Sequence, residues 1–161
     1  MKTHYASPIG TFTLEAEAGQ LIALMFDDTS SEASLPTPED ELVLDETKRQ
    51  LDAYFAKQTM AFSLPLAPRG TAFQRKVWEA LCAIPSGETR SYGAIATSLG
   101  TPNASRAVGG ANHVNPIAII IPCHRVIGSS GKLVGYAGGL DRKEWLLAHE
   151  RGLASQLALL R

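Results

Sequence analysis

The sequence has few cysteines, no long apolar run and no metal-binding spacing. Its 161 residues include two cysteines, Cys82 and Cys123, so reduced thiols are favoured over a disulfide framework. No C-x-x-C or H-E-x-x-H spacing occurs, and no metal site is expected. No apolar run reaches the roughly 20 residues that span a bilayer, and the first residues lack the apolar core of a signal peptide. These absences argue against a membrane-bound or disulfide-rich class and predict a cytoplasmic globular protein.

Acidic and basic residues are unevenly distributed along the chain. Residues 1–66 carry four Lys/Arg and eleven Asp/Glu, whereas residues 67–161 carry eleven Lys/Arg and five Asp/Glu. A basic half joined to an acidic half suggests that the basic half meets a polyanion such as nucleic acid. Two unevenly charged surfaces without a ligand are the alternative on this observation alone.

The first 26 residues have the pattern of antiparallel strands. Phe12, Leu14 and Ala16 alternate with polar residues, as in a half-buried strand. Turn-forming residues precede this strand, and Leu21–Phe26 supplies the next one. A small antiparallel sheet is therefore predicted at the start of the chain.

A loop-like segment, Asp27–Pro38, leads into a predicted helix. Thr37 can cap this helix with Pro38 at its first position and Asp40 closing a capping box. The helix is expected to end near Lys57. A short strand is predicted near Phe62, and the two prolines that follow mark a linker. The resulting domains are residues 1–66 and 67–161. The helix is expected to bury four side chains: Leu44, Leu51, Tyr54 and Phe55.

The second domain is predicted to be mostly helical. Thr71 and Gln74 form a capping box for one helix, and Ser91 caps a short second helix. Asn103 is predicted to cap a third helix, Ala104–Ala111, which completes a helix-turn-helix. This third helix consists almost entirely of small residues plus one arginine, so its backbone can lie close to another surface. Tight packing on a neighbouring helix explains the same pattern equally well.

The chemically distinctive segment follows the apolar run Ile117–Ile121, which is predicted to be a buried strand or core segment. Cys123 leaves this run beside His124 and Arg125, where a thiolate can be stabilised. A buried, inert cysteine is the alternative. Cys82 lies inside a predicted helix with no basic neighbour in sequence, and a core position is expected for it.

The chain ends in a glycine-rich loop and a helix. Residues 129–139 are suited to closing over a ligand, and Asp141 and Glu144 are predicted to cap the final helix. This helix is expected to end at His149–Glu150. A carboxylate there could orient a histidine, as in activated nucleophile systems. A solvated glutamate at a helix end is the alternative.

Pro122–Val126 resembles the active-site signature of the O6-alkylguanine-DNA alkyltransferases. The resemblance covers about residues 69–151, and it implies a ribonuclease-H-like α/β domain followed by a mostly α domain with a winged-helix-like helix-turn-helix. Further segments match in order and at family spacing: Phe73-Gln74-x-x-Val77-Trp78, Ser91-Tyr92, Arg106–Ala111, Asn115-Pro116, Tyr136-x-Gly138-Gly139-Leu140 and Lys143–Leu147.

The resemblance implies that Cys123 is a nucleophile that removes the alkyl group from O6 of guanine, and from O4 of alkylthymine, in a single irreversible turnover. His124 would take the thiol proton through a water molecule, Glu150 would orient His124, and Asn115 would hold the turn that presents the cysteine. No cofactor is expected. Relatives that carry zinc use N-terminal cysteines, and this chain has none before Cys82.

The resemblance also implies how damaged DNA is held. The alkylated base must leave the duplex, and Arg106 would fill the space that it vacates. The helix would lie in the minor groove with little sequence preference, and the protein would act as a monomer on double-stranded DNA. Further DNA contacts are expected from Tyr92, Ala107, Gly109, Gly110 and Arg125. The flipped guanine would be bound by Tyr92, the Val126 carbonyl, Tyr136 and the backbone of Ala137.

Two other classes of function are compatible with parts of the sequence. A DNA-binding sensor or helix-turn-helix regulator would bind without retaining an alkyl group. A cysteine hydrolase using Cys123 with His124 or His149 would turn over repeatedly and would not need Arg106. Retention of a methyl group on the protein distinguishes alkyl transfer from both.

Overall fold

The computed structural model describes residues 1–26, 35–59 and 61–158. Its contacts divide the chain into two compact units, one comprising residues 1–69 and 116–118 and the other residues 70–115 and 119–161. The predicted boundary after residue 66 lies close to this division. Nothing in the sequence indicated that residues 116–118 join the first unit. Most of the loop predicted after Phe26 lies outside the described residues.

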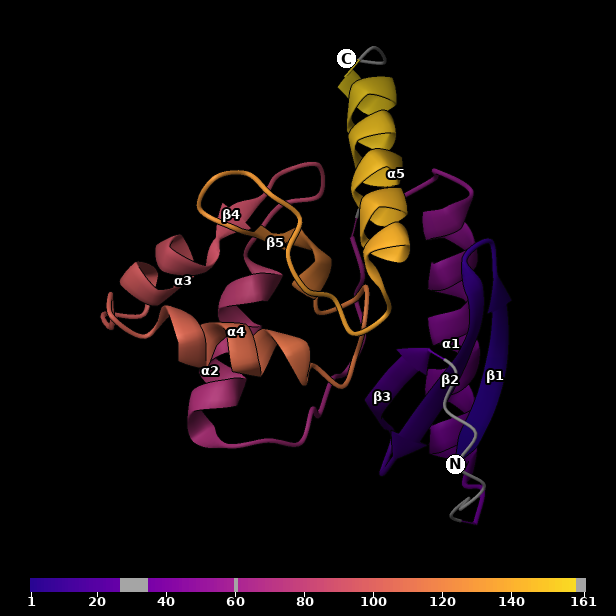
Figure 1. Cartoon of the computed structure of the whole chain (residues 1–161). Helices are drawn as coiled ribbons and strands as arrows, with labels where there is room; N and C mark the ends of the chain where they lie inside the picture. Colours follow the sequence, from indigo (N-terminus) through magenta and orange to yellow (C-terminus); the bar gives the residue numbers. More distant parts are fainter. Residues whose placement is uncertain (27–34, 60, 159–161) are drawn as a thin grey trace. The chain divides into compact units, whose positions relative to one another are not determined.

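The first unit is a three-stranded antiparallel sheet covered by a helix (Figure 1). The predicted sheet is confirmed: β1 (Lys2–Ser7), β2 (Gly10–Glu17) and β3 (Gln20–Phe26) pair in the order β1-β2-β3. The alternating residues of β2 predicted to face the core are completely buried. The helix α1 (Pro38–Phe55) packs on this sheet and adds buried side chains to the core.

Both ends of α1 differ in detail from the prediction. Thr37 is the N-cap, as predicted, and its hydroxyl accepts from the Asp40 backbone N–H at 3.2 Å. The Asp40 carboxylate does not close a capping box; it accepts from the Gly19 N–H at 2.9 Å and so ties α1 to the β2–β3 turn. The helix ends at Phe55, which is half-buried rather than buried.

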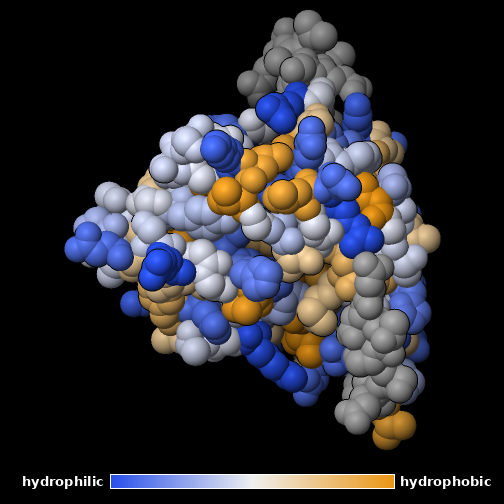
Figure 2. Space-filling view, in the orientation of Figure 1, coloured by the Kyte–Doolittle hydropathy of each residue, from blue (hydrophilic) through white to orange (hydrophobic). Residues whose placement is uncertain are grey.

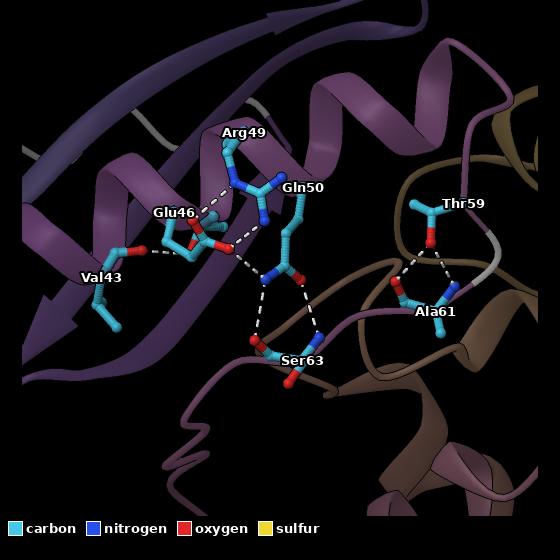
Figure 3. A network of polar contacts seen from close by, with 8 residues as sticks. Val43, Glu46, Arg49, Gln50, Thr59, Ala61 and Ser63 are labelled. Atoms are coloured by element: carbon cyan, nitrogen blue, oxygen red, sulfur yellow. Dashed lines mark hydrogen bonds and ion pairs between the residues drawn. The ribbon is translucent and has the colours of Figure 1, made fainter.

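The strand predicted near Phe62 is wrong, because a side chain occupies the place of a strand partner. The Gln50 amide donates to the Ser63 carbonyl at 2.9 Å and accepts from the Ser63 N–H at 2.9 Å (Figure 3). Gln50 is itself held by Glu46, which also binds Arg49. This network fixes the segment around Ser63 to α1. Among the described residues of the linker, backbone pairing is limited to one bridge, in which the Leu21 N–H donates to the Pro65 carbonyl at 2.8 Å and the Ala67 N–H donates to the Leu21 carbonyl at 2.9 Å.

The apolar run Ile117–Ile121 is a buried core segment but not a strand. The Leu24 N–H donates to the Pro116 carbonyl at 2.8 Å, and the Ala118 N–H donates to the Leu24 carbonyl at 2.9 Å. The run therefore joins the edge of β3 over three residues and then turns away at Ile119, whose φ is +67°. A β-branched residue in this conformation is a strained outlier. The strain lies four residues before Cys123.

The second unit is mostly helical, as predicted. The Thr71–Gln74 capping box of α2 (Ala72–Cys82) and the Ser91 cap of α3 (Tyr92–Ser98) are confirmed. The indole N–H of Trp78 donates to the Ala111 carbonyl at 2.8 Å and thereby pins α2 to α4. Beside these helices lie α4 (Ser105–His113), the short parallel pair β4 (Arg90–Ser91) and β5 (Val126–Ile127), and α5 (Leu140–Ala158).

Three local predictions for this unit are wrong. Asn103 does not cap α4, which begins at Ser105 after an N-cap residue, Ala104, that makes no side-chain cap. Cys82 is exposed at the C-terminal end of α2 rather than in the core. The last helix, α5, begins at Leu140 and continues past Glu150 to Ala158, so Asp141 lies in its first turn and Glu150 in its interior.

Polar side chains cover most of the face drawn in Figure 2, and hydrophobic ones form separate patches between them. Large exposed hydrophobic residues include Leu42 in the first unit, and Val114, Val134 and Leu140 in the second. Within the described residues, no helix is both long enough and apolar enough to cross a membrane.

Candidate active site

Cys123 lies in a single turn of 3-10 helix, η1 (Cys123–Arg125), directly after the strained core segment. Its side chain is buried, and two asparagines hold the turn around it. The Asn115 amide donates to the Ile121 carbonyl at 2.8 Å, and the Asn112 amide donates to the Cys123 carbonyl at 3.3 Å. Asn115 therefore contacts the turn that the family resemblance implied it would hold.

The environment of Cys123 favours a neutral thiol. Burial raises the pKa of the Cys123 thiol, while the Asn115 side chain and the charge of Lys143 oppose this rise. A thiol with a raised pKa is a weak nucleophile until a base removes its proton. The arrangement therefore requires a proton acceptor beside the cysteine.

A buried ionic cluster of His124, Arg125 and Glu150 adjoins the cysteine. His124 Nε2 lies 2.9 Å from Glu150 Oε1, and both side chains are fully buried. The Arg125 guanidinium donates to both carboxylate oxygens of Glu150, at 2.8 and 2.7 Å, and to the Ile84 carbonyl at 2.6 Å. Glu150 is thus joined in one network to Arg125 and His124, which lie 25 and 26 residues earlier in the sequence. The alternative of a solvated glutamate at this position is excluded.

The cluster determines which nitrogen of His124 can act as a base. Burial alone would raise the pKa of Glu150, but the hydrogen bonds from Arg125 and His124 outweigh it and bring the pKa to about 2. An ionised carboxylate only accepts, so Nε2 carries the proton that points at Glu150. Burial lowers the pKa of His124, against the effect of Glu150, and favours the neutral ring. The lone pair therefore lies on Nδ1, which has no hydrogen-bond partner within the described part of the chain.

The expectation that Arg125 contacts DNA is wrong for this conformation. Its side chain is buried, and its donors are directed at Glu150 and Ile84 rather than at solvent. A guanidinium in this position cannot reach a phosphate without leaving the cluster. Its structural effect is to keep Glu150 ionised.

A pocket of about 80 Å³ is lined by residues from α3, α4 and the loop before α5, and one of them, Asn112, holds the Cys123 carbonyl. The Tyr92 hydroxyl donates to the Val134 carbonyl at 3.2 Å and links α3 to that loop. Three residues predicted to bind the base, Tyr92, Tyr136 and Ala137, are brought together here, whereas Cys123 and Val126 are not among the lining residues. The lining residues are Tyr92, Gly109, Asn112, His113, Gly135, Tyr136 and Ala137.

Lys143 holds the loop before α5, which forms one wall of the pocket. The sequence analysis did not assign this role to it. The side chain is fully buried, and its ammonium donates to the carbonyls of Val126, Val134 and Gly135 at 2.6, 3.2 and 3.3 Å. Lysine is almost never buried without such partners. Burial lowers the pKa of Lys143, while the nearby thiol of Cys123 opposes this. The residue lies in the matched segment Lys143–Leu147, but the segment alone did not indicate its contacts.

The two faces of α4 differ, so both interpretations of its small residues have support. Val108 and Ala111 are buried against the rest of the unit. Arg106, Ala107 and Gly110 are exposed. The outer face of α4 therefore has small residues beside the single guanidinium of Arg106. Among the described residues, no cluster of three or more His, Cys, Asp or Glu side chains is arranged to hold a metal ion.

Comparison with known proteins identifies the family of both units. Residues 1–68 match the 6-O-methylguanine DNA methyltransferase ribonuclease-like domain, and residues 72–152 match the DNA binding domain of the same family. A methylated-DNA–protein-cysteine methyltransferase of Methanosarcina acetivorans is 52% identical over 91% of this chain and 95% of its own. One from Mycolicibacterium paratuberculosis is 53% identical over 90% of this chain and 88% of its own.

Solved structures agree with this match. The structure of Mycobacterium tuberculosis OGT in complex with DNA superposes with a TM-score of 0.85 at 50% identity, covering 93% of this chain and 92% of that one. An O6-methylguanine DNA methyltransferase from Methanococcus jannaschii superposes with a TM-score of 0.68 at 29% identity, covering 92% of this chain and 93% of that one. The chain belongs to the 6-O-methylguanine DNA methyltransferase family.

Proposed function

We propose that this protein repairs DNA by moving an alkyl group from O6 of guanine to Sγ of Cys123. Methyl transfer from DNA to a protein cysteine is the activity named for its relatives, and it makes the protein a methylated-DNA–protein-cysteine methyltransferase. The observation that supports Cys123 as the acceptor is the buried Glu150–His124 pair next to it in the chain. That pair leaves a basic nitrogen, Nδ1, on the residue that follows the thiol in the chain, and this thiol needs deprotonation.

The proposed reaction is a displacement at the alkyl carbon. His124 Nδ1 accepts the thiol proton through a water molecule, and the Cys123 sulfur forms a bond to the alkyl carbon. The bond from that carbon to O6 breaks, and its electron pair stays with the guanine, which takes up a proton. The product is a thioether, which has no leaving group that would regenerate the thiol. Each molecule therefore reacts once.

The roles of the other site residues follow from their places. Glu150, kept ionised by Arg125, holds the proton on His124 Nε2, while Asn115 and Asn112 fix the turn that carries the sulfur. Lys143 fixes the Val126 carbonyl and the pocket loop. Tyr92 and Tyr136 bound the pocket that we propose for the extruded base.

DNA is the macromolecular partner, and we propose a minor-groove mode for it. The exposed face of α4 bears small residues at Ala107 and Gly110, which suit a groove too narrow for large side chains. Arg106 stands on the same helix and would fill the stack when the base is extruded. One arginine and few base-reading side chains predict little sequence preference, and we expect a monomer to be sufficient.

Mass spectrometry after reaction with duplex DNA containing O6-methylguanine tests this proposal. We expect one methyl group per molecule, located on Cys123 by peptide mapping. Cys123→Ser should retain none, while the control Cys82→Ser should retain one. A protein that binds this DNA without gaining mass would be a sensor, and one that removes the methyl group without retaining it would be a hydrolase. A methyl group on Cys82 would refute the assignment of the nucleophile.

A further inference from the structure

Hydrogen bonds from two helices hold the two ends of the turn that carries Cys123. At its start, the Asn112 amide of α4 donates to the Cys123 carbonyl at 3.3 Å. At its end, the Lys143 ammonium of α5 donates to the Val126 carbonyl at 2.6 Å. The Val126 N–H also donates to the Cys123 carbonyl and closes the turn itself. All four residues are buried, so water competes little for these bonds.

Tyr92 connects these two anchors through a third helix, α3. Burial and the nearby Cys123 raise the pKa of Tyr92, and a hydrogen bond from the Asn112 side chain opposes this rise. The Tyr92 hydroxyl donates to the Val134 carbonyl at 3.2 Å, and Lys143 donates to the same carbonyl at 3.2 Å. The hydrogen bonds therefore form a closed ring, which includes Cys123, Asn112, Tyr92, Val134, Lys143 and Val126.

The neighbours of Asn112 determine that its amide nitrogen makes both contacts. The Cys123 carbonyl can only accept, so the atom facing it is the nitrogen. The Tyr92 hydroxyl gives its proton to the Val134 carbonyl, so it can only accept from Asn112. This orientation leaves the amide oxygen buried without a hydrogen-bond partner in the described part of the chain, which is costly. The amide thus keeps two donor contacts at the expense of its oxygen.

We propose that Asn112 is a positioning residue that fixes the Cys123 sulfur relative to Tyr92, so that the helix-turn-helix of α3 and α4 also sets the direction of the attack on the alkyl carbon. The inference rests on the proposed function and assigns a further residue to it. Without the Asn112 donor, the Cys123 carbonyl keeps only the Val126 N–H, while Lys143 still holds the other end of the turn. Because displacement requires the sulfur in line with the breaking bond, a shift of about 1 Å can slow the reaction roughly 100-fold.

Single-turnover methyl transfer from a single-stranded oligonucleotide containing O6-methylguanine tests this inference, since no base pair then has to open. The maximal rate and the half-saturating oligonucleotide concentration are measured for the natural protein, Asn112→Leu, Tyr92→Phe and the double variant. Leucine has a similar shape without the donors, and phenylalanine removes only the hydroxyl. Val108→Ala is the control, because it loosens the packing of a fully buried α4 residue without removing a member of the ring.

Asn112→Leu should lower the maximal rate roughly 10- to 100-fold and leave the half-saturating concentration within about twofold. The double variant should be no slower than the slower single variant, because both changes open the same ring. Val108→Ala should melt at a lower temperature but keep its maximal rate when assayed below that temperature. If Asn112→Leu does not fold, hydrogen exchange of the Val126 N–H in Tyr92→Phe decides, and it should be faster than in the natural protein.

An unchanged maximal rate in Asn112→Leu, an equal loss of rate in Val108→Ala, or losses that multiply in the double variant would overturn the inference. Unchanged exchange of the Val126 N–H in Tyr92→Phe would overturn it as well. These results would leave the proposed function intact, whereas absence of methyl transfer to the natural protein would refute the proposed function itself.

Discussion

Removing the guanidinium of Arg125 should destabilise the protein far more than removing an ordinary charged residue. Arg125→Met keeps the length of the side chain but leaves the Glu150 carboxylate, which is 0% exposed, without its bidentate partner. Breaking a buried ion pair in this way costs about 3–5 kcal/mol, because an uncompensated charge stays buried. A whole chain of this size is stable by about 5–15 kcal/mol. We therefore expect a loss of roughly 6–20 °C in melting temperature.

A double-mutant cycle separates this mechanism from a simple loss of packing. In Arg125→Met/Glu150→Leu no charge remains unpaired, so most of the stability lost in Arg125→Met should return. Methyl transfer should not return, since His124 then lacks the carboxylate that holds its tautomer. The measurements are urea unfolding and single-turnover transfer on all four proteins. A loss below about 1 kcal/mol in Arg125→Met, or strictly additive effects in the double variant, would refute the reasoning.

Three further outcomes follow from the site. Arg106→Ala should slow repair of O6-methylguanine in duplex DNA much more than reaction with free O6-benzylguanine, because only the duplex leaves a gap to fill; equal losses in the two assays would give Arg106 a purely structural role. Because burial lowers the pKa of His124, the transfer rate measured at neutral pH should be unchanged at about pH 6.5, the ordinary pKa of histidine. The rate should fall only in more acidic solution. A transfer rate that is already half-maximal at neutral pH would contradict this prediction for His124. The free energy of unfolding should decline below about pH 6.5 and further below about pH 4.3, because the unfolded chain takes up protons on His124 and Glu150 before the folded chain does. Urea unfolding at several pH values measures this decline, and a free energy that stays constant over this range would contradict it.

Local sequence signals predicted the elements but not the contacts that assemble the site. Caps at Thr71 and Ser91, and the alternation in β2, depend on residues a few positions apart, and the structure confirms them. The buried state of Arg125 depends on Glu150, 25 residues later, and on the Ile84 carbonyl, 41 residues earlier. No periodicity contains such information, so the DNA contact that the resemblance implied for Arg125 could not be tested against its burial from the sequence.

The core segment before the cysteine shows why apolar runs are ambiguous. Its composition predicted burial correctly, but a strand and an irregular core segment have the same composition. The difference arises from Leu24, whose edge groups pair with Pro116 and Ala118, and from the turn at Ile119. Lys143 and Asn112 were missed for a related reason: each acts through carbonyl groups that the fold brings near, and a carbonyl has no sequence signature.

The same tight turn predicts what happens to the protein after it reacts. A methyl group on Cys123 enlarges a side chain that is 5% exposed, in a turn held by Asn112 and Asn115 and preceded by the strained Ile119. Overpacking such a site typically costs about 1–3 kcal/mol. The methylated protein should therefore melt roughly 2–12 °C below the unreacted one. It should also release DNA more readily, because the carbonyl of Cys123 is bound to the α4 residue Asn112. Thermal unfolding before and after stoichiometric reaction tests this, with the same preparation exposed to unmethylated DNA as the control. An unchanged or higher melting temperature would mean that the turn accommodates the methyl group without displacing α4.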